Sequence, residues 1–106
     1  MASGLPAALK AAGLSPTTIG YAPTPGSLQD IKDGKITAGL GVDFPVALWM
    51  AVDVAARLVL GEALTPGEQA GSAPEQLLEQ KDITFDPRKG WTGYPAFAQK
   101  SAALWQ

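Results

Sequence analysis

The chain has 106 residues with a formal charge of −2, and 46% of them are hydrophobic while 17% are charged. This is the composition of one small folded domain, not of a disordered tail. The absence of cysteine and histidine excludes a disulfide framework, thiolate chemistry and the commonest general base.

Two helices alternate with two strands in the first part of the chain. We expect a short helix over Leu5–Leu14 and a strand over Thr17–Tyr21, bounded by prolines on both sides. Ser27 is predicted to cap a helix of one to two turns that Gly34 ends. Ile36–Val42 carries no charge, and its glycines allow close approach of another backbone or a ligand, so it indicates a buried strand.

The strongest pattern predicts a helix over Pro45–Leu60. Asp43 precedes it, proline suits its first turn, and Gly61 is placed to end it. Its charged residues are Asp53 and Arg57, four positions apart with the acid first, and apolar residues occupy most of the remaining circumference. Such a helix requires cover on more than one side.

The last third of the chain is less regular. Thr65–Pro74 is turn-rich and predicted to be a surface excursion, and the pattern of Glu75–Thr84 fits either a helix or a strand. A loop is expected at Asp86–Gly90. A final helix over Pro95–Trp105 places Phe97, Leu104 and Trp105 near one face, which Ser101 interrupts.

The order of these elements predicts an α/β fold with a partial, Rossmann-like parallel sheet and flanking helices. Two strands are too few to complete a parallel sheet, whose faces need cover and whose strands need neighbours. We therefore expect residues 1–106 to form a single incomplete domain.

Several segments, taken in order, resemble a known family. Gly20–Gly26 is followed by Leu28–Ala38, in which Ile31-Lys32-Asp33-Gly34 forms an "Ile-Lys-x-Gly" step. Asp43, the predicted helix from Ala47 to Leu60, and Lys81-Asp82-Ile83 continue the series. Together they are similar to the C-terminal part of type I periplasmic sugar-binding proteins of ABC importers, over almost the whole chain.

The resemblance implies a bilobal protein that closes over a monosaccharide or similar small polyol and presents it to an ABC permease. Residues 1–42 would belong to one lobe, 43–80 to the other, and 81–106 to a return segment and C-terminal helix. The parent protein would be periplasmic, although the N-terminus of this chain has no signal-peptide pattern. A fragment of this kind is expected to form a homo-oligomer or domain-swapped dimer, or to reassemble with a missing N-terminal portion.

Candidate ligand-binding residues come first from the loop after the Thr17–Tyr21 strand. In the resembling family this loop often carries an aspartate two residues beyond a glycine, and here that position is Ala22. Some relatives instead use backbone and small side chains, which makes Ala22, Pro23 and Thr24 candidates. The alternative is a turn shaped by its prolines, without a ligand role.

Asp43 and Trp91 complete the candidate site. Asp43 follows an uncharged strand at a topological switch, where a ligand-facing group is expected, but it could equally be a helix N-cap. Trp91 and Tyr94 could stack on a sugar ring or pack a loop onto the core. We assign Trp49 and Trp105 to packing.

Other functions receive less support from the sequence. Lys and Arg form no basic stripe, which disfavours a nucleic-acid partner. The apolar run Phe44–Val52 is too short to insert across a membrane. The spacing of Asp30, Asp82 and Asp86 is not that of a calcium loop, so neither a metal nor a cofactor is predicted. No catalytic constellation is visible and no enzyme is expected; the open alternatives are an effector-binding fragment of a transcription regulator and a stand-alone dimerising module.

Overall fold

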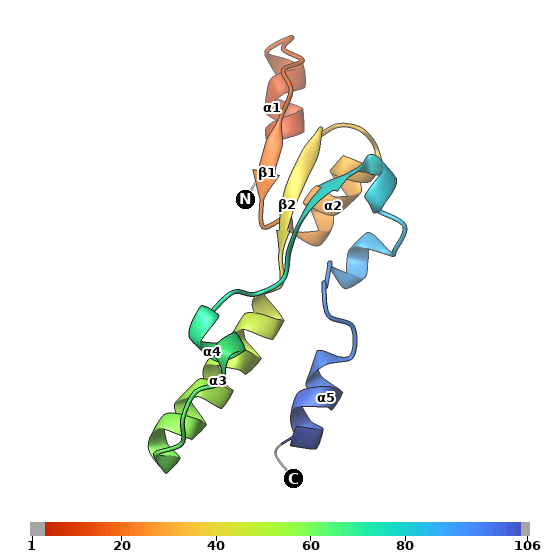
Figure 1. Cartoon of the computed structure of the whole chain (residues 1–106). Helices are drawn as coiled ribbons and strands as arrows, with labels where there is room; N and C mark the ends of the chain where they lie inside the picture. The colour runs from red at the N-terminus through yellow and green to blue at the C-terminus, as the bar shows by residue number, and fades with distance from the viewer. Residues whose placement is uncertain (1–3, 105–106) are drawn as a thin grey trace. The chain divides into compact units, whose positions relative to one another are not determined.

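The computed structural model describes residues 4–104, which form a mixed α/β structure (Figure 1). The chain divides into a first unit, Met1–Val42 with Glu75–Thr92, and a second unit, Asp43–Pro74 with Gly93–Gln106. The backbone therefore passes from one unit to the other three times. Each unit is described by itself.

The first unit contains three strands and two α-helices. In chain order these are α1 (Leu5–Ala11), β1 (Ile19–Tyr21), α2 (Pro25–Lys32), β2 (Ala38–Val42) and β3 (Glu75–Glu79), followed by 3-10 helices at Gln80–Asp82 and Pro87–Lys89. The helix expected over Leu5–Leu14 and the strands expected over Thr17–Tyr21 and Ile36–Val42 are confirmed with shorter bounds. The loop predicted at Asp86–Gly90 contains the second 3-10 helix.

The sheet has the order β1-β2-β3 and is mixed. β1 and β2 are parallel, as predicted, with Tyr21 opposite Leu40. β3 resolves the ambiguous segment as a strand, but it runs antiparallel to β2, with Leu77 opposite Leu40. The prediction of a parallel sheet therefore holds for the first pair of strands and is wrong for the second.

Helix α2 begins one turn earlier than the sequence indicated. Its N-cap is Thr24, whose side chain accepts a hydrogen bond from the Ser27 N–H at 3.3 Å. Pro25 fills the first helical position, where its fixed φ and missing N–H fit best. Ser27 therefore lies inside the helix and is not its cap, while Gly34, with φ of 74°, follows the helix end as expected.

One face of the sheet is covered. Helix α2 lies against it (Figure 1), and Leu28 and Ile31 of this helix pack with side chains from β3 and the segments around it. The buried cluster consists of Leu28, Ile31, Ile36, Leu78 and Ile83, with Phe85 and Trp91 packed against it. This small cluster is the core of the first unit.

The opposite face of the same sheet carries several exposed apolar side chains, with Glu75 and Glu79 at the two ends of β3. Since side chains alternate along a strand, the registers place Ile19, Tyr21, Leu40 and Leu77 together on this face, which we call the open sheet face. Ile19 is 69% exposed, and Tyr21 and Leu77 are also exposed. A parallel pair of strands normally has both faces covered.

The second unit consists of helices. They are α3 (Phe44–Leu60), α4 (Pro66–Ala70) and α5 (Phe97–Leu104). The prediction for α3 is confirmed, and Gly61 ends it in the left-handed conformation with φ of 72°. The turn-rich excursion contains α4, which the sequence analysis did not predict. The final helix is confirmed as far as Leu104, and Trp105 lies outside the described residues.

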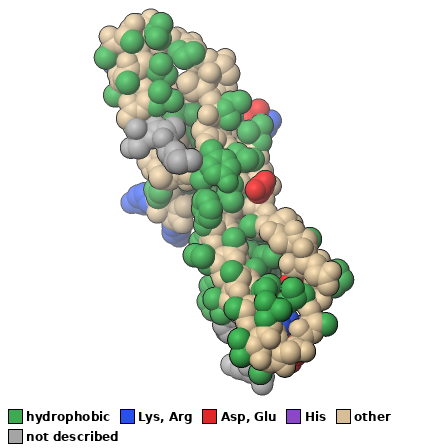
Figure 2. Space-filling view, turned by 90° about the vertical axis from the view of Figure 1, so that its left-hand side faces the viewer, with side chains coloured by type: hydrophobic (Ala, Val, Ile, Leu, Met, Phe, Trp, Pro, Cys, Tyr) green, Lys and Arg blue, Asp and Glu red, His purple; other side chains and the backbone are tan. Residues whose placement is uncertain are grey.

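Helix α3 is covered along one stripe only. Val46 is buried and Trp49, Met50, Asp53 and Arg57 are half-buried on that stripe, whereas Val59 on another side is 86% exposed. Figure 2 shows a face of the molecule where hydrophobic side chains gather in extended patches. Among residues 4–104, no helix is long and apolar enough to cross a membrane.

Candidate functional site

The loop that follows β1 holds three of the predicted ligand residues. Ala22 adopts a φ of 48°, which is unusual for a residue other than glycine, and its N–H donates to the Leu40 carbonyl at 2.9 Å. Pro23 packs its ring against the backbone of Gly39, and Thr24 caps α2. The loop is thus held at the C-terminal ends of two parallel strands, the position where open α/β sheets bind ligands.

Asp43 is fully buried and its carboxylate has two backbone donors. Val46 N–H donates to Oδ1 at 3.2 Å, and Gly93 N–H donates to Oδ2 at 2.9 Å. The first bond makes Asp43 the N-cap of α3. The second ties the start of α3 to the segment that leads into α5, so this side chain organises the second unit.

The two predicted aromatic residues have different surroundings. Trp91 is half-buried, and its indole lies so close to Gly41 that a Cβ on this glycine would meet ring carbon Cε3 at 2.9 Å. Tyr94 is exposed, and the ammonium group of Lys100 lies 4.5 Å from its ring centroid. Trp91 therefore packs on the sheet, next to the core, while Tyr94 carries a cation–π contact.

The structure brings Pro23 and Trp91 to one face of β2, on Gly39 and Gly41 respectively. These glycines allow close approach, as predicted, but what approaches them is a set of side chains from the same unit. Asp43 belongs to the second unit. None of the five predicted residues lines either of the two cavities described next.

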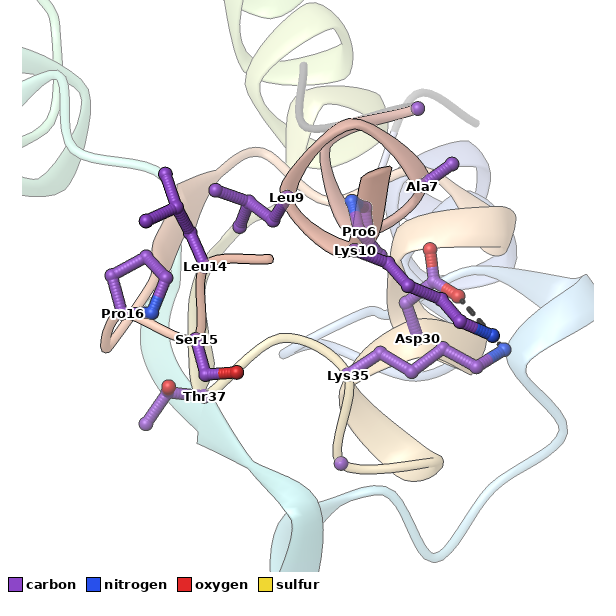
Figure 3. Close-up of a pocket in the computed structure, with 12 residues that line it drawn as sticks. Pro6, Ala7, Leu9, Lys10, Leu14, Ser15, Pro16, Asp30, Lys35 and Thr37 are labelled. Atoms are coloured by element: carbon purple, nitrogen blue, oxygen red, sulfur yellow. Dashed lines mark hydrogen bonds and ion pairs between the residues drawn. The ribbon is translucent and has the colours of Figure 1, made fainter. Parts of the chain in front are cut away.

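A cavity of about 730 Å³ lies in the first unit, between α1 and the end of α2 (Figure 3). Leu9, Leu14 and Pro16 lie on one side of it, and Lys10 and Lys35 extend on the other side (Figure 3). The positive charge of Lys35 on the polar side is partly neutralised, because its ammonium group forms ion pairs with Asp30 at 3.4 Å and with Asp33 at 3.2 Å. Helix α1 buries none of its residues, so this cavity is the space beneath a loosely attached helix.

A second cavity lies in the second unit between α3 and α5, and we call it the α3–α5 groove. It has a volume of about 340 Å³ and is mostly apolar. Trp49 of α3 and Phe97 of α5 meet edge to face in its wall, with ring centroids 6.3 Å apart. The remaining lining residues are Val46, Met50, Asp53, Glu68, Ser72, Pro74, Tyr94, Ser101 and Leu104.

Two carboxylates that line this groove form part of a charged cluster around Arg57. The guanidinium lies 3.3 Å from Asp53, 2.8 Å from Glu68 and 3.2 Å from Glu62. A hydrogen bond with Asp53 is the first cause that lowers the pKa of Glu68 to about 2, and hydrogen bonds from Thr65 add to it. Glu68 is therefore ionised throughout the ordinary pH range.

Part of this groove could have been predicted from the sequence. Phe97, Ser101 and Leu104 have helical spacing in the sequence, and all three line one wall of the groove. The polar Ser101 in this otherwise apolar row is the signal that the sequence offers. Thr65 and Glu68 have the spacing of a capping box, which the structure contains at the start of α4. The expected ion pair between Asp53 and Arg57 is also present.

No three His, Cys, Asp or Glu side chains within residues 4–104 are placed to hold a metal ion. Comparisons with protein-family models, with curated proteins and with solved structures gave no significant match, so the resemblance to type I periplasmic sugar-binding proteins stays a prediction.

Proposed function

We propose that this chain is part of a bilobal solute-binding protein of the type I periplasmic sugar-binding class, whose ligand is a sugar or a similar small polyol delivered to an ABC importer. The order of motifs from Gly20 to Ile83 suggests the class. The division of the chain supports it, because each unit is assembled from two separate segments, as the lobes of such a protein would be.

The observation that carries the ligand-binding part of the proposal is the backbone of Ala22. A left-handed conformation costs about 1–2 kcal/mol for a residue with a Cβ, and strained backbone is concentrated at functional sites. Here the strain occurs where β1 ends beside β2, at the C-terminal edge of a parallel pair. The ligand of an open α/β sheet is expected at this edge.

The open sheet face supports the view that the chain is a part of something larger. Within residues 4–104, the three-stranded sheet leaves Ile19, Tyr21 and Leu77 exposed, whereas helices cover a parallel sheet on both sides. In the proposed parent protein, an N-terminal portion supplies this cover. In its absence, we expect the chain to associate with a second copy of itself.

Sugar binding is tested by NMR on the 106-residue chain and on the product of its full reading frame. A panel of pentoses, hexoses and polyols is titrated while the amides of residues 20–24 are followed. We expect one sugar to shift these amides saturably in the longer protein. The proposal fails if the reading frame has no N-terminal portion, or if no sugar moves these amides in either protein.

A matched pair of variants locates the site. Asparagine tolerates the left-handed conformation, so Ala22→Asn preserves the loop while it adds a polar side chain, and we expect it to change sugar affinity. Ala96→Asn makes the same change at the other non-glycine residue with positive φ, 61°, and should leave affinity unchanged. Adjacent permease and ATPase genes would support the importer, whereas an upstream helix-turn-helix in the frame would indicate a regulator.

Self-association is tested separately by sedimentation equilibrium. The double variant Ile19→Lys with Val59→Lys places charges on the open sheet face and on the exposed side of α3. We expect the unsubstituted chain to have a mass above that of one copy, and the double variant to have a lower average mass. A single-copy particle for the unsubstituted chain would contradict this expectation.

A further inference from the structure

The α3–α5 groove has the features of a small-molecule site. Ligand pockets are usually about 300–1,000 Å³, lined by apolar and aromatic side chains with a few convergent polar groups. The groove falls in this range at about 340 Å³. Its aromatic wall includes Trp49, Tyr94 and Phe97, and its polar groups include the carboxylates of Asp53 and Glu68.

The charge at the groove indicates which ligand it prefers. Among residues 4–104, its lining contains two carboxylates and no Lys or Arg. In the charged cluster described above, the three carboxylates of Asp53, Glu62 and Glu68 share the single positive charge of Arg57. A cation near these carboxylates is therefore favoured over an anion.

The closeness of two of these carboxylates to one guanidinium strengthens this argument. Asp53 and Glu68 both contact Arg57, at 3.3 Å and 2.8 Å, so the two groups lie close together at the groove wall. The Glu68 side chain is only 9% exposed, so solvent screens its charge weakly. An ammonium group in the groove would be attracted by both carboxylates.

We propose that the α3–α5 groove binds a small aromatic amine, with its ring against Trp49 and Phe97 and its ammonium group donating to Asp53 and Glu68. The site lies within the second unit and is independent of the sugar site proposed at Ala22. Besides Arg57, Lys100 also contacts the groove wall, through the ring of Tyr94. It would favour an anion instead, so the experiment includes one.

Three probes of similar shape separate these possibilities. 2-Phenylethylamine, 2-phenylethanol and phenylacetate are titrated into the full chain, and two-dimensional NMR follows the Trp49 indole N–H and the amides of α3 and α5. We expect the amine to bind with roughly millimolar affinity, as its size allows. Its affinity should exceed that of the alcohol by about tenfold, the effect of one charge-assisted hydrogen bond.

Variants identify the groups responsible. Asp53→Asn should weaken amine binding about tenfold, while Asp33→Asn, which makes the same charge change on the first unit, should leave it unchanged. Ser101→Phe places a ring in the groove and keeps both carboxylates, so it should abolish binding even if Asp53→Asn proves unstable. Helical circular dichroism establishes that each variant is folded.

The proposal is overturned if the three probes bind equally, if phenylacetate binds best, or if the shifted signals lie outside the groove. It also fails if Ser101→Phe binds the amine as well as the unsubstituted chain does. If a second copy of the chain fills the groove, sedimentation will show a dimer and the amine will move none of the groove signals, which equally refutes it.

Discussion

Replacing Gly41 by alanine should destabilise the first unit measurably. An added Cβ would lie 2.9 Å from Leu78 Cδ1 and 2.9 Å from Trp91 Cε3, whereas ordinary van der Waals contacts begin at 3.4 Å. Both neighbours would have to move by about 0.5 Å. Neither moves freely, because Leu78 is buried in the core and Trp91 is packed against it.

The magnitude follows from two opposing effects. Overpacking of this kind typically costs about 1–3 kcal/mol. Alanine also restricts the unfolded chain, which returns about 0.4–1 kcal/mol. The steric effect is larger, so we expect a net loss of about 1–2 kcal/mol in the free energy of unfolding.

Urea unfolding followed by far-UV circular dichroism, at one fixed protein concentration, measures this loss. Gly67→Ala is the matched control, because its added Cβ meets nothing within 4 Å and it lies inside α4. This control should be neutral or stabilising by up to about 1 kcal/mol. In a Trp91→Ala background the cost of Gly41→Ala should fall by at least half. Equal effects of the two glycine substitutions, or strict additivity with Trp91→Ala, would refute the argument.

Three further predictions concern helix starts and charge. Asp43→Ala removes the acceptor for the N–H groups of Val46 and Gly93, so it should lower the free energy of unfolding in urea by about 2–4 kcal/mol. Asp43→Asn should lower it less, because asparagine can still cap α3. Equal losses for the two variants would contradict this. Thr24→Ala should cost about 1 kcal/mol and Ser27→Ala clearly less, because Thr24 is the N-cap of α2; the reverse order would place the cap at Ser27. The pKa of Glu68 is lowered to about 2, so its contribution to stability is present above the ordinary carboxyl range and is lost as the pH falls toward 2. Glu68→Gln should therefore flatten the decline of stability between pH 4.5 and 2, and an unchanged pH profile would refute it.

The helices were the most predictable part of the fold, because their ends carry local signals. Pro45 near the start of α3 and Gly61 after its end fix this helix from the sequence alone, and the structure agrees to within one residue. The cap of α2 was misplaced for a local reason as well. Pro25 suits the first helical position, which makes the preceding Thr24 the cap, and this could have been deduced from the sequence.

The third strand could not be deduced in the same way. Leu77 and Leu78 are adjacent apolar residues, because Leu78 enters the core while Leu77 points to the open sheet face. Their strand therefore shows no alternation of polar and apolar residues. Its antiparallel pairing with β2 depends on contacts between residues more than thirty positions apart, for which a single sequence holds no local signal.

The candidate sites likewise combine features with a local sequence signal and features that depend on contacts between distant residues. The strained Ala22 lies in a loop that the sequence marks by its prolines, but the strain itself depends on the hydrogen bond from Ala22 to Leu40. Trp91 was a candidate because it is aromatic, and only the packed structure places it on Gly41. The α3–α5 groove needs three separate helices, so only its Phe97, Ser101 and Leu104 wall was visible beforehand.

The two units differ in what holds them together, and this difference bears on both proposals. The first unit has a continuous buried cluster of five apolar side chains. In the described part of the second unit, the buried side chains are Val46 and Asp43. Its helices are held instead by the hydrogen bonds of Asp43 and by the ion pairs of Arg57. Because small units need a substantial apolar core, the second unit should gain more stability than the first from anything that fills its groove or covers α3.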